Sequence, residues 1–197
     1  MEISSALPIM NSSFNHHFQR RRSMCKTYQK IRLLGKGGMS QVWLVEHLET
    51  KKRYACKICK KDDAKSALYA SALRKEACLL AGLHHPMIPS LIEYDPKGSF
   101  VMEYIEGESL DQYIGRKISR KQLITWMKEV RDILDYLHYH GIYYLDVKPQ
   151  NLICDKQKHL HLIDFGVSVS EENQKVYALT PRLWSTGVKK AEAHCHM

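Results

Sequence analysis

Two loops in the second half of the chain carry polar residues at positions that suit catalysis. Asp146 opens the segment DVKPQN, which ends in Asn151, and Asp164 opens the tripeptide DFG. Each loop follows a short apolar run, so its polar groups lie at the end of an expected strand, where catalytic residues are often placed. Alone, however, a DFG tripeptide is common and mostly indicates a turn.

Two charged residues in the first half occupy positions where a charge is unusual. Lys57 lies in the apolar run YACKIC, and Glu76 shares one face of an expected helix with Leu73 and Leu80. Taken singly, each is more simply interpreted as facing solvent. A buried charge needs an opposite charge beside it, so together Lys57 and Glu76 offer each other a partner.

A glycine-rich segment, GKGGMSQV at residues 35–42, lies between the first two expected strands. Small residues there let backbone N–H groups approach phosphate oxygens closely. The segment lacks the residue order of a Walker A loop, and a strand rather than a helix follows it, which excludes a Rossmann motif. By itself it is equally compatible with an ordinary hairpin turn.

The hydrophobic pattern predicts the elements that position these residues. For the first part these are strands at 28–33, 42–45 and 54–59 in an antiparallel sheet, a helix at 66–81, and strands at 90–94 and 99–104. After Gly107 a long amphipathic helix is expected, with its apolar stripe formed by Leu123, Met127, Val130, Leu134 and Leu137 and its end marked by Gly141. Short apolar runs follow at 142–145, 152–153 and 160–163. This order predicts an α+β protein with two lobes and a cleft between them.

All five motifs, in this order, resemble the catalytic domain of eukaryotic-like serine/threonine protein kinases. The resemblance covers roughly residues 28–181. It implies a two-lobed fold, with a β-rich N-lobe that holds one helix and an incomplete α-rich C-lobe. It also implies ATP and Mg²⁺ as cofactors and the transfer of a phosphoryl group to a Ser or Thr hydroxyl of a protein substrate.

The resemblance assigns a role to each matched residue. The expected nucleotide-binding residues are Leu34, Gly35, Lys36, Gly37, Gly38, Ser40, Val42, Ala55, Lys57, Met102, Glu103 and Ile105. The expected catalytic residues are Asp146, Lys148, Lys57 and Glu76, and the expected Mg²⁺ ligands are Asn151 and Asp164. Lys148, two residues after Asp146, is typical of the serine/threonine class. Met102 would guard the back of the adenine pocket, with the Glu103 carbonyl and the Ile105 amide meeting adenine.

The chain departs from the family pattern at two places. The family's His-Arg-Asp appears as Tyr144-Leu145-Asp146. Leucine cannot make a charge-assisted contact with a phosphorylated activation loop, so we expect no requirement for such phosphorylation through this residue. We expect Tyr144 to pack beneath the DFG segment, as the usual histidine does.

The second departure follows Thr180-Pro181, where the match to the activation segment stops. The heptapeptide RLWSTGV (residues 182–188) can be encoded by a nucleotide sequence that yields GYGAPE when it is read one nucleotide later, and this restores the family motif. The hypothesis is a frameshift near Arg182, and the alternative is a natural, divergent short end. Sequencing the gene past the codon for Pro181 decides between them.

The expected organisation is therefore a disordered basic tail, an N-lobe with hinge, a partial C-lobe, and an out-of-frame or unstructured tail, at residues 1–26, 27–105, 106–181 and 182–197. Loss of the remaining C-lobe helices would expose apolar surface and impair catalysis. Weak nucleotide binding and little phosphotransfer are expected from this chain alone.

Composition narrows the class of protein. The formal net charge is +9, with +10 in residues 1–61 and −1 in the remainder, and no apolar run could span a bilayer. Six scattered cysteines without a signal peptide favour the cytoplasm, and a zinc site at Cys56-x-x-Cys59 is not expected.

Arg20–Arg22 suggest an anionic contact, but nothing resembles a nucleic-acid-binding motif, so no nucleic-acid partner is expected. The oligomeric state is not predicted.

Two other classes of function remain as alternatives. One is a non-catalytic, nucleotide-binding pseudokinase-like or scaffold protein, whose cellular role would survive Asp146→Ala. The other is a small-molecule phosphotransferase, which the glycine-rich loop and the Asp-x-Lys-Pro-x-Asn loop make less favoured than a protein kinase.

Overall fold

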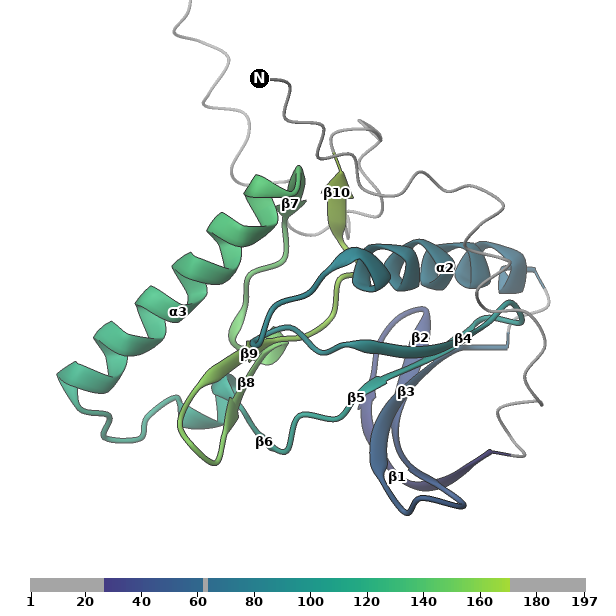
Figure 1. Cartoon of the computed structure of the whole chain (residues 1–197), viewed down its shortest axis with the longest axis horizontal. Coiled ribbons are helices and arrows are strands. Elements are labelled where there is room, and N and C mark those ends of the chain that lie inside the picture. Colours follow the sequence, from purple (N-terminus) through teal and green to yellow (C-terminus); the bar gives the residue numbers. More distant parts are fainter. Residues whose placement is uncertain (1–26, 62–63, 171–197) are drawn as a thin grey trace, which may run out of the picture.

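The computed structural model describes residues 27–61 and 64–170 of the 197-residue chain (Figure 1). The expected tails at 1–26 and 182–197, and the segment around Thr180-Pro181, lie outside the described residues. No helix in the described ranges combines the length and the apolar character that crossing a membrane requires.

The first part of the chain forms a five-stranded antiparallel sheet in the order β1-β2-β3-β5-β4. The strands are β1 (Tyr28–Lys36), β2 (Ser40–His47), β3 (Arg53–Cys59), β4 (Leu91–Asp95) and β5 (Ser99–Glu103). The alternating pattern therefore predicted all five, although β1 and β2 extend beyond the expected ranges. Gly98 lies in the turn between β4 and β5 with φ +95°, and a side chain there would overlap the Cys59 thiol, so the tight turn requires glycine.

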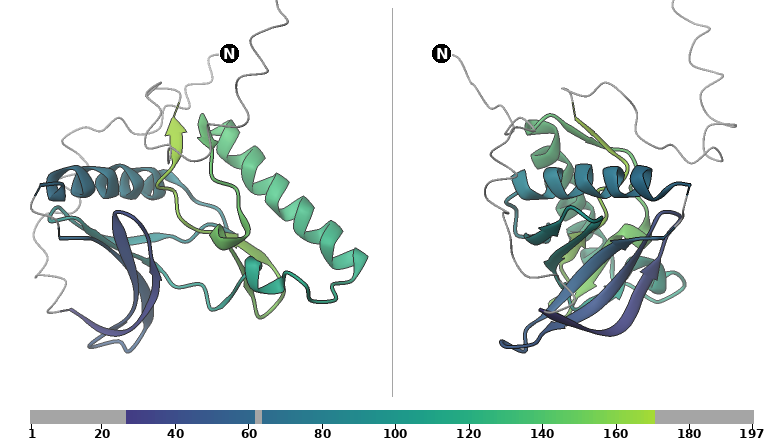
Figure 2. Two further views of the ribbon diagram at one scale, coloured as in Figure 1. Left: turned by 180° about the vertical axis from the view of Figure 1, so that it is seen from behind. Right: turned by 90° about the vertical axis from the view of Figure 1, so that its right-hand side faces the viewer.

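One helix, α2 (Ser66–Gly82), covers this sheet (Figures 1 and 2). It contacts β3, β4 and β5, and it buries Leu73, Ala77 and Leu80 against them. Glu76 lies on this same inner face, where it is 4% exposed. The predicted helix is thus present, and the acidic residue on its apolar face points inward rather than to solvent.

The second part contains one long helix and several short strands (Figure 2). Its elements are β6 (Gly107–Ser109), η2 (Leu110–Tyr113), α3 (Arg120–Tyr139), β7 (Ile142–Tyr144), η3 (Pro149–Asn151), β8 (Leu152–Asp155), β9 (Leu160–Leu162) and β10 (Ser168–Ser170). The strands form a three-stranded sheet, β6-β8-β9, and a two-stranded ribbon, β10-β7. The pattern predicted β7, β8 and β9, but not β6 or β10, because GES and SVS are not apolar runs.

Helix α3 begins and ends where the sequence indicates. The Ser119 hydroxyl accepts a hydrogen bond from the Gln122 amide at its start, and Gly141 follows its end with φ +67°. The predicted apolar stripe packs only in part, with Leu137 buried and Val130 and Leu134 packed against the core. Trp126, Glu129, Ile133 and Leu137 are buried, whereas Leu123 and Met127 are exposed. The indole N–H of Trp126 donates to the Lys158 carbonyl at 2.8 Å, so the face of α3 that contains Trp126 meets the turn between β8 and β9.

Candidate active site

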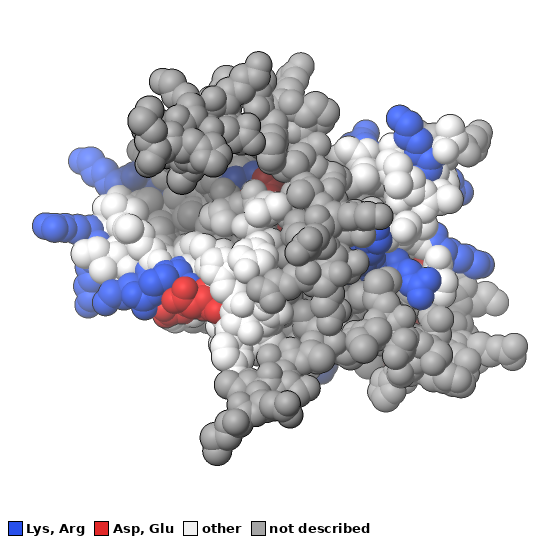
Figure 3. Space-filling view, turned by 90° about the horizontal axis from the view of Figure 1, so that it is seen from above, with Lys and Arg blue, Asp and Glu red and all other residues white. Residues whose placement is uncertain are grey.

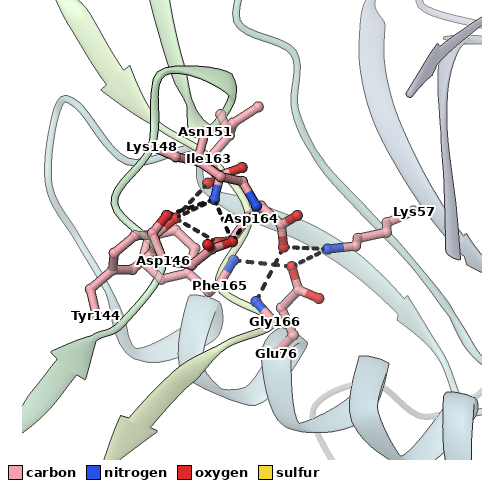
Figure 4. A network of polar contacts seen from close by, with 10 residues as sticks. All are labelled: Lys57, Glu76, Tyr144, Asp146, Lys148, Asn151, Ile163, Asp164, Phe165 and Gly166. Carbon is pink, nitrogen blue, oxygen red and sulfur yellow. Dashed lines mark hydrogen bonds and ion pairs between the residues drawn. The ribbon is translucent and has the colours of Figure 1, made fainter. Parts of the chain in front are cut away.

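A buried ion pair joins the sheet to helix α2. The Nζ atom of Lys57 on β3 lies 2.6 Å from Oε1 of Glu76, and both residues are at most 5% exposed. Burial would lower the pKa of Lys57, but the carboxylates of Glu76 and Asp164 outweigh it and raise that pKa. Burial raises the pKa of Glu76, and the Lys57 charge opposes this shift. The lysine is therefore a fixed cation held inside the protein (Figure 4).

The DFG segment meets the same lysine from the second part of the chain. Oδ1 of Asp164 lies 2.8 Å from Lys57 Nζ and accepts a hydrogen bond from the Gly166 amide at 3.2 Å. The Phe165 amide donates to Glu76 Oε1 at 3.2 Å. Burial works to raise the pKa of Asp164, but Lys57 dominates and the net shift is downward. Asp164 is thus an anion at neutral pH, bound to both parts of the chain (Figure 4).

The loop between β7 and η3 brings three further predicted residues together. Lys148 Nζ lies 2.5 Å from Asp146 Oδ2. The Asn151 amide group donates to the backbone carbonyl of Asp146 at 3.0 Å and to its Oδ2 at 3.1 Å. Pro149 begins the short helix η3, which ends at Asn151. Asp146 is consequently held by a cation on one side and an amide on the other.

Tyr144 connects the two acidic loops, a role that sequence reasoning did not assign to it. Its hydroxyl donates to the Asp164 carbonyl at 2.9 Å and accepts from the Asn151 amide at 3.1 Å. Its ring meets Phe165 edge to face, with centroids 5.7 Å apart. The expectation of packing against the DFG segment is therefore correct, but the hydrogen bonds add a function that packing alone lacks. Its place beside Asp146 in the sequence is the signal that could have revealed this.

Asp164 adopts a backbone conformation that non-glycine residues rarely take, with φ +70°. Such strain persists only where surrounding contacts fix it. Tyr144 holds the Asp164 carbonyl, while Lys57 and the Gly166 amide hold its carboxylate. These contacts, which come from both parts of the chain, fix the orientation of the Asp164 carboxylate.

The glycine-rich turn joins β1 to β2. The Gly37 amide donates to the Ser40 carbonyl at 2.9 Å, and the Met39 carbonyl accepts from the Lys60 amide at 2.9 Å. These bonds fix the turn over the end of β3. A Cβ at Gly35 or Gly38 would meet no atom within 4 Å, so close approach to a ligand rather than crowding within the protein would account for glycine there.

The other predicted nucleotide-binding residues flank this turn. Ala55 and Met102 pair in register on β3 and β5 and are both buried, and Leu34 and Val42 pack against the same apolar cluster. Glu103 is the last residue of β5, and the chain between it and β6 contains Ile105. Their contacts with adenine stay predictions, as do those of Lys36 and Ser40 with phosphate.

The side-chain oxygens of Asp164 and Asn151 are of the kind that bind a hard cation such as Mg²⁺. Asp164 supplies a carboxylate, and the Asn151 amide nitrogen is engaged by Asp146 and Tyr144, which leaves Oδ1 as the atom of that side chain available to a metal. Among the described residues, no group of three or more His, Cys, Asp or Glu side chains could enclose a metal alone. Two protein ligands completed by phosphate oxygens are the arrangement in which proteins commonly hold Mg²⁺.

An antiparallel sheet with one helix, a lysine–glutamate pair beneath a glycine-rich turn, and two acidic loops define a protein kinase domain. Residues 28–186 match the family model of the protein kinase domain, and the chain belongs to this family. It is 31% identical over 148 residues to serine/threonine-protein kinase PrkC of Bacillus subtilis, covering 73% of this chain and 23% of the relative. It is 30% identical over 175 residues to flippase kinase 1 of Saccharomyces cerevisiae, covering 85% and 20%.

A third relative is also a eukaryotic protein kinase. The cAMP-dependent protein kinase catalytic subunit of Dictyostelium discoideum is 27% identical over 194 residues, covering 95% of this chain and 30% of the relative. The chain thus spans less than a third of the length of these three relatives. The resemblance recognised from five motifs is confirmed at the level of the family, with relatives in the serine/threonine class.

Proposed function

We propose that this chain binds ATP with Mg²⁺ and carries the catalytic residues that transfer its terminal phosphoryl group to a Ser or Thr hydroxyl of a protein. The observation that carries the proposal is the polar network in Figure 4, in which Lys57, Glu76 and Asp164 lie beside the Asp146–Asn151 loop. Phosphoryl transfer depends on positioning and charge neutralisation more than on covalent chemistry, and this network supplies both.

Each residue has a task that its surroundings support. Lys57, a buried cation fixed by Glu76, would bind phosphate oxygens. Asn151 and Asp164 would hold Mg²⁺, which supplies charge neutralisation of the phosphates when bound. Asp146 would orient the substrate hydroxyl and accept its proton, and Lys148, 2.5 Å from that carboxylate, would neutralise the transferring group.

The proposed domain limits are an N-lobe with hinge at 27–105 and a C-lobe portion at 106–181. We also propose that the protein acts in a reducing compartment such as the cytoplasm, because Cys56, Cys59, Cys78 and Cys154, the cysteines of the described ranges, form no disulfide bond. A protein substrate is favoured over a small molecule because the chain carries both the glycine-rich loop and the Asp-x-Lys-Pro-x-Asn loop.

Nucleotide binding and phosphotransfer test the proposal separately. The purified chain should bind ATP more tightly with Mg²⁺ than without it, and Asp164→Asn should remove that difference. Phosphotransfer to a generic protein substrate should be weak and should disappear in Asp146→Asn, because the general base is lost. Binding without any Asp146-dependent transfer would instead favour a non-catalytic, nucleotide-binding protein. A chain that does not bind ATP at all would contradict the proposal.

A further inference from the structure

The β8–β9 hairpin carries both proposed metal ligands at one end. Asn151 immediately precedes β8, and Asp164 follows β9 by two residues. Leu152 pairs with Leu162, and the Ile163 amide donates to the Asn151 carbonyl at 2.9 Å. The separation of the two ligands is therefore set by the geometry of the hairpin, and any loosening of the hairpin changes it.

The opposite end of this hairpin, the turn at residues 156–159, is bound to helix α3. The Lys158 carbonyl accepts hydrogen bonds from the Trp126 indole at 2.8 Å and from the Gln122 side-chain amide at 3.1 Å. Lys158 itself has φ +70°, so the turn presents this carbonyl in a strained conformation. The helix thus holds the turn at a fixed place through groups that the phosphate-binding residues never touch.

Glu129 is the charged member of this attachment. It is 7% exposed in the middle of α3, and both of its carboxylate oxygens are used. Oε1 lies 2.7 Å from Nδ1 of His159, and Oε2 accepts the Leu160 amide at 3.0 Å. A buried carboxylate is costly unless it is fully hydrogen-bonded or paired with a cation. The buried Glu129 carboxylate is therefore stabilised most strongly when His159 is protonated and carries a positive charge.

Two acidic groups act on His159. Glu129 contacts the His159 side chain from α3. Asp155 lies at the start of the turn that contains His159, and its Oδ1 accepts a hydrogen bond from the His159 backbone amide at 2.9 Å. The hydrogen bond to Glu129 raises the pKa of His159 above its ordinary value. The second oxygen of Asp155 contacts Nε2 of His161 at 3.0 Å, so Asp155 is shared between the two histidines. A raised pKa in the folded state means that the attachment is strongest at low pH and weakens as the pH rises through that pKa.

We propose that Glu129 is a positioning residue, which forms with His159 a charge-dependent clamp (Glu129, His159 and the Leu160 amide) that keeps Asn151 and Asp164 at the spacing Mg²⁺ needs. The clamp acts through the hairpin and touches neither nucleotide nor metal. It rests on the proposed function in so far as Asn151 and Asp164 bind Mg²⁺. Its consequence is a metal-dependent affinity for nucleotide that falls when His159 loses its proton.

Glu129→Gln is the informative variant, because glutamine can still accept the Leu160 amide and donate to a neutral His159 while it removes the charge. The dissociation constant of ATP is measured with and without Mg²⁺ at about pH 6 and about pH 8.5, on either side of an ordinary histidine pKa. The gain in ATP affinity that Mg²⁺ provides should decrease between the lower and the higher pH. We expect this decrease to be about threefold larger in the wild type than in Glu129→Gln, which is the size expected of a partly exposed ion pair. Comparison at equal pH removes the titration of ATP itself.

Lys156→Gln is the matched control. Lys156 lies on the same turn, and its ion pair with Glu106, 2.8 Å long and solvent-exposed, does not involve α3. This variant should keep the pH dependence of the wild type. An equal pH dependence in wild type and Glu129→Gln would overturn the proposal, and so would its loss in the control.

Hydrogen exchange of the Ile163 amide provides a readout that needs no nucleotide. At about pH 6, Glu129→Gln should accelerate this exchange, corrected for the intrinsic rate, because the hairpin opens more often. If the wild type binds no Mg-ATP but this acceleration is observed, the proposed function fails and the clamp stands. If Mg-ATP binds and the exchange is unchanged, the clamp fails and the proposed function stands.

Discussion

Lys57 shows how much one residue depends on its partners. Lys57→Met leaves Glu76 as a buried, unpaired carboxylate, because the lysine Nζ is its only charged partner among the described ion pairs. We expect this variant to lose about 3 kcal/mol of unfolding free energy. The double variant Lys57→Met/Glu76→Leu should recover part of that loss, because the buried charge is removed while the Phe165 amide still loses its acceptor and Asp164 its cation.

Urea unfolding of the two variants and the wild type measures this prediction. Neither variant should bind ATP with the affinity of the wild type. If the double variant regains unfolding free energy but does not bind ATP, the structural role of the Lys57–Glu76 pair is separated from its role in nucleotide binding. If the single and double variants are equally unstable, the ion pair is not what determines the stability of this site.

Tyr144 can be tested at the same scale. Tyr144→Phe removes the hydroxyl that joins the Asp164 carbonyl to the Asn151 amide while it keeps the ring against Phe165. We expect a loss of about 1–2 kcal/mol in the binding of Mg-ATP, because the Asp164 carbonyl loses its donor, and a smaller loss for ATP without Mg²⁺. Isothermal titration calorimetry measures both values.

Tyr139→Phe serves as the comparison for Tyr144→Phe, since Tyr139 is 70% exposed on α3. It should leave both affinities unchanged. Equal losses with and without Mg²⁺ in Tyr144→Phe would mean that the hydroxyl supports the fold in general rather than the metal ligands.

At the scale of elements, hydrophobic periodicity was sufficient for the sheet and for the existence of both helices. Lys57 and Glu76 were predicted to pair because their polar character conflicts with apolar surroundings, and this conflict is visible in a sequence. The proximity of Asp146, Lys148 and Asn151 could also be predicted, because the three residues lie within one short loop. Their chemical roles came from resemblance to a family, not from periodicity.

Other features were beyond the sequence. The buried face of α3 includes Trp126, whose indole N–H donates to a backbone carbonyl 32 residues away, and such a contact leaves no trace in the spacing of apolar residues. The strand β6 depends on Gly107, where a side chain would overlap the Cys154 carbonyl. Likewise, the hydroxyl contacts of Tyr144 depend on tertiary geometry. Long-range pairings of this type are set by packing and not by local pattern.

On the scale of the whole molecule, charge and apolar surface are both unevenly placed. Lys and Arg side chains project at both sides of the molecule when it is viewed from above, while Asp and Glu are sparse on that face (Figure 3). Helix α3 also leaves an apolar stripe uncovered, with Leu123 45% and Met127 73% exposed. Beside it lies an apolar depression lined by Val130, Ile133, Leu134, Val147, Leu152 and Leu162. Contiguous apolar surface of this kind promotes association.

We therefore expect Met127→Lys to reduce aggregation of the purified chain severalfold while it changes the unfolding free energy by no more than about 0.5 kcal/mol, as an exposed substitution should. Light scattering over a range of concentrations measures the first quantity and urea unfolding the second. Leu68→Lys is the control, because Leu68 is 65% exposed on α2, away from this stripe. Equal effects of the two substitutions would show that added charge, rather than the stripe, governs association.

The β8–β9 hairpin also bears on the order in which the site assembles during folding. Asn151 and Asp164 are thirteen residues apart and meet through a local hairpin, whereas Lys57 and Asp164 are separated by 107 residues. Closing a short loop has a smaller entropic cost than closing a long one, and local contacts form faster. We therefore expect the half of the site that is proposed to bind Mg²⁺ to form early and from its own segment. The lysine that is proposed to bind phosphate should join it only when the two ends of the domain come together.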